Sequence, residues 1–353
     1  MSITSESFSS GIAMSDPIGL AQVGVGYWGK NLLRNFTKLR EARVLAVFDH
    51  EARVRDEIRR EYPQLFQARN YDEMLATSGV EAVVIATDTP HHFGLAKRAL
   101  EQGKHVFVEK PMTQTLAESE ELASLAESRE RHLMVGHLLL YHPAYRFVED
   151  AVRSGKLGEV YYLYSVRANL GIVRQNENVL ESLAPHDIAV AVAMLPGKAL
   201  AVSAQGSAYL QPGIEDVCFT TIFFEGGALA HLHSSWLDPN KIRRLTVVGS
   251  EKMAVVDDLE GREKVRLYDR DFTGDESHYA DFAGAISVRA GDIVIPRIDS
   301  SEPLRLECKH FVDCIRSGSS PRSNGSNGLE VMRILSGAQT SLRNRGRVVD
   351  LRP

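Results

Sequence analysis

The sequence contains few cysteines. Cys218, Cys308 and Cys314 are the only three among 353 residues, and no two of them form a Cys-x-x-Cys pair. A scattered, odd number of thiols excludes a disulfide framework and lacks the spacing of zinc ligands, so we predict no metal site. Free thiols are typical of a reducing compartment, and we therefore expect a cytoplasmic protein.

Long hydrophobic runs are also missing. No apolar stretch approaches the ~20 residues that a membrane-spanning helix requires, so we expect no membrane partner. Residues 1–16 are rich in serine and have no basic stretch followed by an apolar core, which is not the pattern of a secretion signal. We expect this segment to be a disordered leader.

The charge balance excludes one more class of partner. The formal net charge is -5, whereas a broad nucleic-acid interface needs a basic face, so we predict no nucleic-acid partner. Apolar residues make up 44% of the chain and charged residues 25%, which is ordinary for a globular protein. A chain of 353 residues is long enough for two domains.

The first part of the chain alternates short apolar runs with helical stretches. Strands are predicted at residues 18–25, 44–48, 82–86, 106–108 and 133–135, and helices at 28–39, 51–61, 71–77, 92–100, 116–128 and 143–153. This order predicts a doubly wound parallel sheet of the Rossmann type, which we assign to a domain over residues 17–140.

From about residue 156 the pattern changes to β-rich runs with few helices between them. The predicted strands cover residues 160–168, 199–209, 217–224, 228–236, 245–249, 252–257 and 348–351, with helices at 186–195, 303–317 and 329–344. We expect an α+β domain over residues 141–353 with a large, mainly antiparallel open sheet, and residues 270–302 as a long irregular loop. The final helix and strand are expected to pack back on the first domain.

A glycine motif lies between the first predicted strand and the first predicted helix. Gly24, Gly26 and Gly29 match G-x-G-x-x-G, in which the glycines permit a tight turn, the approach of a pyrophosphate and close helix packing. Asp49 follows Gly29 by 20 residues at the end of the second strand, where an acidic residue binds ribose hydroxyls and repels a 2′-phosphate. Together the two signals predict a dinucleotide, and Asp49 favours NAD over NADP, although nearby Arg53 would suit NADP.

The run Glu109-Lys110-Pro111 directly follows the strand at 106–108. It therefore lies at the carboxyl edge of the predicted sheet, where folds of this kind bind ligands. A desolvated lysine in such a cleft has a lowered pKa and can transfer protons. A solvated lysine paired with Glu109 is the other reading that this position allows.

Three segments together resemble the Gfo/Idh/MocA oxidoreductases: GVGYWGKN (24–31), ATDTPHH (86–92) and GKHVFVEKP (103–111). The resemblance implies an NAD-binding domain followed by an α+β domain with a large open sheet. It also implies that Lys110 is catalytic and that Lys110–Pro111 is a candidate for a cis peptide. The implied cofactor-binding residues are Gly24, Gly26, Tyr27, Trp28, Gly29, Asp49, Thr87, Thr89, Pro90, His92, Glu109 and Lys110.

The segment Ala184-Pro185-His186-Asp187-Ile188 resembles the second catalytic element of that family. By this resemblance His186 is the acid/base histidine, and imidazole does titrate near neutral pH. Inositol dehydrogenases of the family usually carry aspartate four residues earlier, whereas this chain has Ser182. That departure argues against a free polyol substrate and leaves the proton transfers to Lys110 and His186. Helix capping or a buried hydrogen bond is the alternative role for the histidine.

The resemblance also implies a set of substrate-binding residues. They are Lys110, Tyr141, Arg167, Asn169, Arg174, His186 and Trp236. Arginines can bind a diphosphate bidentately, and the segments together most resemble the sugar-nucleotide dehydrogenase branch of the family. The implied reaction is NAD-dependent oxidation of a sugar hydroxyl to a ketosugar, at C3 of UDP-N-acetylglucosamine. An aminotransferase would then be a pathway partner, in polysaccharide or lipopolysaccharide biosynthesis.

The sequence leaves other functions open. One is a ketosugar reductase, or a free-sugar or inositol dehydrogenase, on the same scaffold. Another is a non-catalytic NAD-sensing regulator, which needs the glycines and Asp49 but has no use for Lys110 together with His186. Residues 218–224 carry apolar side chains on both alternations, so we also expect a homodimer or homotetramer that forms through the open sheet.

Overall fold

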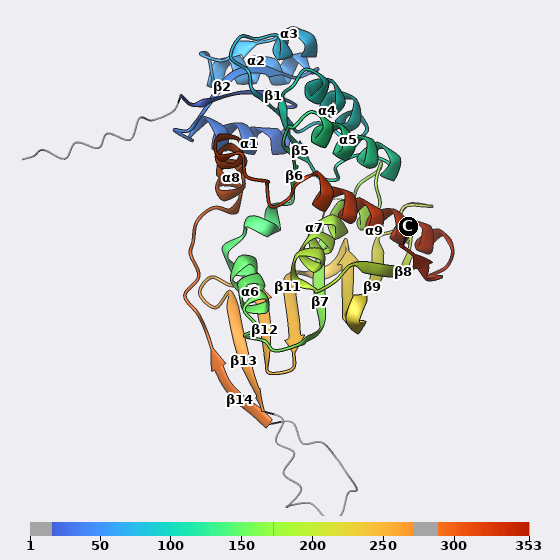
Figure 1. Ribbon diagram of the computed structural model, residues 1–353. Coiled ribbons are helices and arrows are strands. Elements are labelled where there is room, and N and C mark those ends of the chain that lie inside the picture. Colours follow the sequence, from blue (N-terminus) through green and yellow to red (C-terminus); the bar gives the residue numbers. More distant parts are fainter. Residues whose placement is uncertain (1–15, 172, 272–288, 353) are drawn as a thin grey trace, which may run out of the picture.

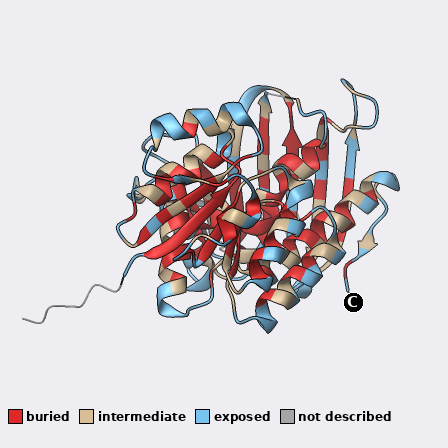
Figure 2. Ribbon diagram, turned by 90° about the horizontal axis from the view of Figure 1, so that it is seen from above, coloured by how far each residue is buried: buried red, intermediate tan, exposed pale blue. Residues whose placement is uncertain are grey.

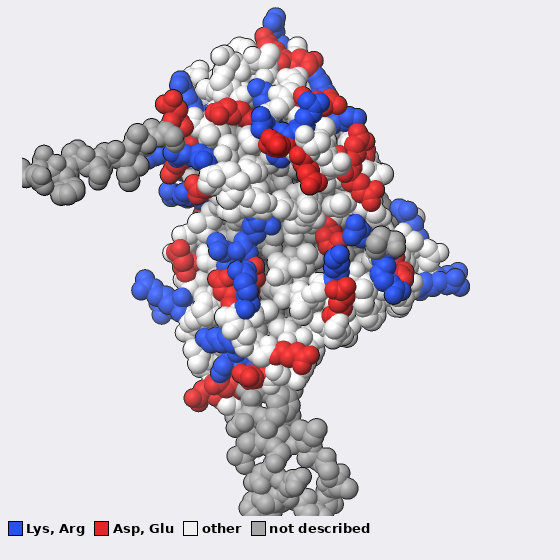
Figure 3. Space-filling view, viewed as in Figure 1, with Lys and Arg blue, Asp and Glu red and all other residues white. Residues whose placement is uncertain are grey.

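Two β-sheets organise the chain, and Figure 1 shows one above the other. The computed structural model describes residues 16–171, 173–271 and 289–352. The chain crosses from the first sheet to the second through a short 3₁₀ helix, η2 (Leu138–Tyr141), and helix α6 (Pro143–Arg153). Basic and acidic side chains lie next to one another over the face shown in Figure 3.

The first sheet is parallel and doubly wound, with six strands in the order β3-β2-β1-β4-β5-β6. The strands are β1 (Ile18–Val23), β2 (Ala42–Phe48), β3 (Phe66–Gln67), β4 (Ala82–Ile85), β5 (His105–Glu109) and β6 (Leu133–Gly136). The connecting helices are α1 (Tyr27–Thr37), α2 (Ala52–Glu61), α3 (Tyr71–Leu75), η1 (Thr89–His91), α4 (His92–Glu101) and α5 (Leu116–Ser128). The predicted Rossmann architecture is confirmed.

The apolar runs of the first domain follow from this arrangement. Every residue of β1 and β4 is buried, because helices cover both faces of a parallel sheet. Figure 2 shows buried strands with helices on either side, and the outward sides of those helices are exposed. The strand order reverses between β1 and β4, and open α/β sheets bind ligands at the carboxyl ends of the strands beside such a switch point.

The second sheet has nine strands in the order β14-β13-β12-β11-β7-β10-β9-β8-β15. They are β7 (Val160–Leu170), β8 (Ala199–Ser207), β9 (Val217–Phe224), β10 (Leu229–Ser235), β11 (Leu237–Gly249), β12 (Lys252–Asp257), β13 (Val265–Asp271), β14 (Arg289–Val294) and β15 (Val349–Asp350), with a 3₁₀ turn η3 (Glu225–Gly227) after β9. Among the described strands of this sheet, only β10 and β7 pair in parallel, so the predicted mainly antiparallel sheet is confirmed.

Three predictions about the elements of this domain were wrong. The final strand, β15, was expected to pack back on the first domain but pairs with β8 at the edge of the second sheet. Residues 270–302, expected as an irregular loop, contain the end of β13 and the whole of β14; residues 272–288 lie outside the described part of the chain. Helix α7 (Val179–Met194) was expected to begin at His186 but begins seven residues earlier, with Pro185 inside it. An Asn178–Glu181 capping box starts this helix, so Pro185 lies inside it and not before it.

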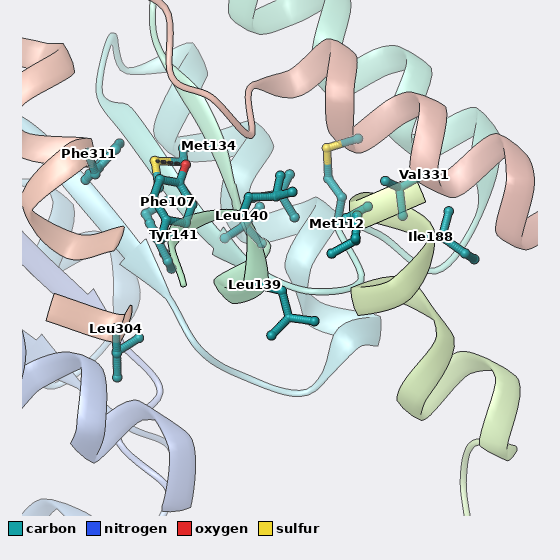
Figure 4. Close-up of a cluster of buried hydrophobic side chains, with 14 of the residues drawn as sticks. Phe107, Met112, Met134, Leu139, Leu140, Tyr141, Ile188, Leu304, Phe311 and Val331 are labelled. Atoms are coloured by element: carbon teal, nitrogen blue, oxygen red, sulfur yellow. Dashed lines mark hydrogen bonds between the residues drawn. The ribbon is translucent and has the colours of Figure 1, made fainter. Parts of the chain in front are cut away.

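The C-terminal helices return to the first sheet. Helix α8 (Pro303–Ser317) contacts α1 and η2, while α9 (Gly325–Arg343) contacts α5, α7 and β8. Figure 4 shows the apolar cluster at this junction, in which Phe311 lies near Phe107 and Tyr141. The rings of Phe107 and Phe311 pack edge to face at 5.7 Å, a favourable geometry for aromatic pairs. Among the described residues, no helix combines the length and the apolarity needed to cross a membrane.

A buried carboxyl group interrupts this apolar junction. Glu307 on α8 is 1% exposed, and neither of its oxygens has a hydrogen-bond partner in the described residues. Burial, followed by the nearby Glu109 carboxyl, raises the pKa of Glu307 well above its usual value. The fold therefore favours the protonated form of this side chain.

We expect Glu307→Gln to stabilise the protein more at about pH 8 than at about pH 5. A carboxyl with a raised folded-state pKa contributes stability that is fully present below the unfolded-state pKa and is lost as pH rises through the folded-state pKa. Glutamine has no such titration, so the difference in free energy of unfolding should grow as pH rises above about 4.3. Urea unfolding at both pH values measures it. Glu120→Gln, on the exposed side of α5, is the control, and an equal gain for Glu307→Gln at both pH values would contradict the prediction.

Candidate active site

The glycine loop joins β1 to α1 at the carboxyl edge of the first sheet. Gly24 has φ +82°, the left-handed region, and a Cβ added to it would lie 2.4 Å from the Ala86 carbonyl oxygen. A Cβ on Gly29 would lie 2.2 Å from the carbonyl oxygen of Gly24. Only glycine fits these two positions, because the first needs positive φ and the second a close approach of two backbone segments.

Gly26 differs from its two neighbours in the motif. It is the N-cap of α1 and has no side-chain cap, and a Cβ added to it would meet no atom within 4 Å. Gly26 therefore leaves space at the N-terminus of α1, where the first N–H groups of a helix can bind a pyrophosphate. The residues present at this loop fit a dinucleotide.

Asp49 at the end of β2 holds the glycine loop in place. Its Oδ2 accepts a hydrogen bond from the Val25 N–H at 2.8 Å, and its Oδ1 accepts one from the Glu51 N–H at 2.9 Å. A carboxylate has further lone pairs that remain available to ribose hydroxyls. Arg53, the residue that would suit NADP, donates to Glu57 at 3.3 Å on the exposed side of α2.

Glu109 joins the catalytic loop to the glycine loop. Its Oε1 accepts a hydrogen bond from Trp28 Nε1 at 2.5 Å, and its Oε2 accepts one from the Lys110 N–H at 3.2 Å. Burial raises the pKa of Glu109 to about 7, although these hydrogen bonds favour the ionised form. A Cβ on Gly136 would lie 3.0 Å from the Glu109 carboxyl group, so the end of β6 leaves room for it.

The other predicted cofactor residues follow the carboxyl ends of β1 and β4. Tyr27 is exposed in the first turn of α1, while Thr87, Thr89 and Pro90 precede or form η1. His92 is buried beneath them, with its ring nitrogens 2.9 Å from the carbonyl oxygens of Thr87 and Pro111. The ring therefore links the loop after β4 to the loop after β5, and desolvation lowers its pKa.

Lys110, which directly follows β5, and His186 on helix α7 come together from the two domains. The Lys110–Pro111 peptide is cis, and Lys110 Nζ donates to the Ser182 carbonyl oxygen of α7 at 2.9 Å. Residue 186 lies one helical turn further along the same helix, on the same side as residue 182. Burial lowers the pKa of Lys110. Burial and then the Lys110 charge lower that of His186, so both groups are biased toward their neutral, basic forms.

A further histidine, His137, belongs to this environment and was missed by the sequence predictions. It directly follows β6, is 1% exposed, and has no hydrogen-bond partner for either ring nitrogen in the described residues. Desolvation and the Lys110 charge lower its pKa to about 3. Nδ1 of His186 is likewise buried without a partner. The signal in the sequence was the place of His137 at a carboxyl strand end.

Arg167 and Asp187 form a buried ion pair beside the histidine. Arg167 Nε donates to Asp187 Oδ2 at 2.6 Å and Nη2 to Oδ1 at 3.1 Å, and the Ser165 hydroxyl donates to the same Oδ1 at 2.7 Å. The pair ties α7 to β7 immediately next to His186. The positive charge of Arg167 is thus matched inside the protein, which places this arginine in a positioning role.

The remaining predicted substrate residues are not all at the site. Tyr141 lies in the apolar cluster of Figure 4, where its hydroxyl is 2.8 Å from the Ser323 hydroxyl. Trp236 is 2% exposed in the core. These two residues lie away from the site. Arg174 is exposed, 3.6 Å from Glu177, but the charges of both act on Lys110. Asn169 at the end of β7 contacts Arg243, whose charge acts on His186. Within the described ranges, no cluster of histidine, cysteine or carboxylate side chains has the geometry of a metal site.

Comparisons with known proteins agree with this geometry. Residues 18–137 match the family model described as the Gfo/Idh/MocA oxidoreductase family with an NAD-binding Rossmann fold, and residues 145–255 match the model of its C-terminal domain. A curated relative, scyllo-inositol 2-dehydrogenase (NAD(+)) of Bacillus subtilis, is 24% identical over 340 residues, which cover 93% of each chain.

Solved structures share the whole fold. UDP-N-acetylglucosamine 3-dehydrogenase GnnA from Acidithiobacillus ferrooxidans is 23% identical, with a TM-score of 0.79 over 92% of this chain and 98% of that one. An oxidoreductase from Agrobacterium radiobacter, solved with NAD+, L-tartaric acid and magnesium, is 18% identical, with a TM-score of 0.78 over 95% and 98%. At these identities the likeness establishes the fold and leaves the substrate open.

The glycine loop gives a test of the cofactor site that separates binding from folding. Gly26→Val adds a side chain to open space, so we expect an unchanged melting temperature but NAD binding weakened by about 100-fold or more (about 2.7 kcal/mol). Gly29→Val is the matched variant, which should lower the melting temperature because its Cβ collides with backbone. Thermal unfolding and NAD titration by tryptophan fluorescence measure the two effects. Undiminished NAD binding by Gly26→Val would rule out this loop as the pyrophosphate site.

Proposed function

The chain belongs to the Gfo/Idh/MocA family of NAD-binding oxidoreductases, and from this premise we propose that it oxidises a sugar hydroxyl to a ketone. The substrate that we propose is a UDP-N-acetylhexosamine such as UDP-N-acetylglucosamine, oxidised at C3. NAD supplies the hydride acceptor when it is bound at the glycine loop. Everything else that the reaction needs is positioning and proton transfer by the protein.

The observation that carries this proposal is the meeting of Lys110 and His186 beside the glycine loop. Loss of hydride from a carbon bearing a hydroxyl leaves a protonated carbonyl unless a base removes the hydroxyl proton. Lys110 or His186 accepts that proton, and burial lowers the pKa of both groups, which shifts each of them toward its neutral form. The Lys110–Ser182 hydrogen bond and the Arg167–Asp187 ion pair hold the two bases in register.

Two features support a sugar nucleotide over a free polyol. Ser182 occupies the position at which inositol dehydrogenases usually carry aspartate, and a solved neighbour with this fold is named for UDP-N-acetylglucosamine. Oxidation of a free sugar or an inositol is the second candidate, favoured by the relative from Bacillus subtilis. The same residues would also serve a ketosugar reductase in reverse, whereas an NAD-sensing regulator would not need a pair of bases.

Further proposals follow from the sugar-nucleotide assignment. The product would be a 3-keto sugar, which is the kind of carbonyl compound that an aminotransferase consumes, so we propose such an enzyme as the next in the pathway. A role in polysaccharide or lipopolysaccharide biosynthesis in the cytoplasm is consistent with a nucleotide-activated sugar substrate.

We expect NADH to form with UDP-N-acetylglucosamine and not with myo-inositol or scyllo-inositol, as followed by the absorbance of reduced nicotinamide. Lys110→Met and His186→Gln should each lower kcat by about 100-fold or more while NAD binding is retained, since general-base catalysis contributes that much. Lys97→Met on the surface of α4 is the control.

The pH profile adds a second readout to the same experiment. In the oxidative direction kcat/KM of the wild type should rise with pH, through a pKa below the ordinary range of lysine, and Lys110→Met should lose that rise. Turnover of an inositol alone would favour the second candidate. NAD binding and full activity in the Lys110→Met enzyme would refute the catalytic assignment.

The uncovered face of the second sheet supports an oligomer. Along β10 the residues alternate, with Ala230 and Leu232 buried toward α7 and Leu229 and His231 exposed. Tyr162, Tyr164 and Phe219 share the exposed face at 42%, 39% and 44% exposure. An apolar sheet face of this kind is typical of a surface that is covered by another protein.

We expect light scattering to show a dimer or tetramer that forms through this face. Tyr164→Glu together with Phe219→Glu should yield monomers, because two carboxylates would be buried in the contact. Phe66→Glu, at an equally exposed aromatic side chain on β3 of the first sheet (45% exposed), is the control that should keep the oligomer. A monomeric wild type would remove the proposal.

A further inference from the structure

Arg243 on β11 has an environment unlike that of the other arginines near the site. Its Nη1 donates to the carbonyl oxygens of Ile242 at 2.8 Å and Ala168 at 3.0 Å, and its Nη2 donates to Asn169 Oδ1 at 2.7 Å. All three acceptors are neutral. A guanidinium has five N–H groups, so these bonds hold the side chain in place and still leave donors available.

The charge of Arg243 is not matched by a carboxylate. Its cross-strand partner on β7 is Arg167, which has Asp187 as its own counter-ion. Arg244, the next residue on β11 but on the opposite face, is paired with Asp257 at 2.7 Å. For Arg243 the described part of the chain contains no ion pair, although the side chain is half-buried.

The two carboxylates that act on Arg243 at longer range are both engaged elsewhere. Asp187 binds Arg167, while Asp258 lies 2.9 Å from His142 Nε2 and 3.6 Å from Lys264 Nζ. Desolvation and the Arg167 charge therefore outweigh them and lower the pKa of Arg243. A half-buried cation with no counter-ion is costly unless a partner is supplied by a ligand.

The side-chain amide of Asn169 adds a further N–H donor beside those of Arg243. A guanidinium has no acceptor, so the contact with Arg243 requires that Asn169 turn its Oδ1 toward the arginine and its Nδ2 away. That Nδ2 has no hydrogen-bond partner in the described residues. A Cβ on Gly171 would lie 1.9 Å from the same nitrogen, so glycine at position 171 leaves room for the amide.

This donor set lies in the environment of the catalytic histidine. Arg243 pairs across the sheet with Arg167, which binds the residue next to His186. Among the charges that act on His186 are those of Lys110, Arg167 and Arg243. A ligand group at Arg243 would therefore belong to a molecule that also reaches Lys110 and His186.

We propose that Arg243 and Asn169 form the anion-binding site for the substrate and select sugars that carry a phosphate or carboxylate group. This inference rests on the proposed function, since it names the chemistry by which the same active site recognises its sugar. Arg167, which the sequence singled out for that task, keeps α7 in place through Asp187 instead.

Binding to the NAD-loaded enzyme by calorimetry tests the proposal. The anionic probes are UDP-N-acetylglucosamine, glucose 6-phosphate and glucuronate, and the neutral probes are N-acetylglucosamine and glucose. We expect at least one anionic probe to bind about 10- to 100-fold more tightly than its neutral counterpart, as for hydrogen bonds to a charged group. Comparison of glucose 6-phosphate with glucuronate separates phosphate from carboxylate recognition.

Three variants identify the residues responsible. Arg243→Gln should abolish the preference for the anion, and so should Asn169→Asp, which keeps the arginine and its strand contacts but supplies a carboxylate partner to it. Arg244→Gln, one residue away on the opposite face, should keep the preference. If Asn169→Asp has the melting temperature of the wild type, its loss of anion preference reflects a change in charge recognition and not in folding.

The results distinguish this proposal from the proposed function. Equal binding of anionic and neutral probes by the wild type, or an unaltered preference in Asn169→Asp, would overturn the anion site even if sugars are oxidised. An anion preference that depends on Arg243, without NADH formation from any sugar, would support the anion site and overturn the proposed reaction.

Discussion

The hydrogen bond from Lys110 Nζ to the Ser182 carbonyl oxygen is the contact on which the active site depends. It joins the carboxyl edge of the parallel sheet to helix α7 of the second sheet, and it does so with an ammonium group that burial makes less basic. The carbonyl is a neutral acceptor that orients the lysine, and desolvation of Lys110 outweighs the opposing charges of Glu177 and Glu109. A lysine held in this way can give up its proton and recover it at modest cost.

The buried ionisable groups on the two sides of this contact differ in their sign of charge and in whether they have a counter-ion. On the cofactor side, Glu109 and Glu307 are buried carboxyl groups whose pKa values are raised, and Glu109 links Trp28 of the glycine loop to the catalytic loop. On the substrate side, the Arg167–Asp187 pair is neutral overall and Arg243 is left as an unmatched cation. Two bases whose pKa values are lowered thus lie in the same environment as Arg243, which has only neutral hydrogen-bond acceptors in the described residues.

The C-terminal elements α8, α9 and β15 stabilise the contact between the two domains. Phe311 on helix α8 packs against Phe36 and Phe107 of the first domain, with ring centroids 6.4 Å and 5.7 Å apart. Helix α9 contacts both α5 and α7, and β15 adds to the edge of the second sheet at β8. These C-terminal elements thus connect the cofactor domain to the helix that carries His186, since α9 contacts both α5 and α7. Each of the contacts joins residues more than one hundred positions apart in the sequence.

The sequence by itself determined those features that depend on local backbone geometry and on periodicity. Residue type predicts the positive φ at Gly24 and the close packing at Gly29, and strand order predicts the position of Lys110 at the carboxyl edge of the sheet. These features can therefore be inferred from one sequence. The parallel and mainly antiparallel sheets follow equally from apolar runs. The start of α7 is also encoded locally, in the capping box at Asn178, although the predicted helix began at His186.

Only the tertiary structure decided which charged groups are matched and which are not. Arg167 and Arg243 look alike in sequence, yet one has Asp187 as its partner and the other has neutral acceptors, because β7, β11 and α7 meet far apart along the chain. For the same reason, namely that distant segments of the chain meet, the sequence did not predict the burial of Tyr141 and Trp236. Nor did it predict that the ring nitrogens of His137 have no hydrogen-bond partner in the described residues. Desolvation and pairing are properties of the packed interior, where groups distant in sequence share one low-dielectric environment, and no local pattern records them.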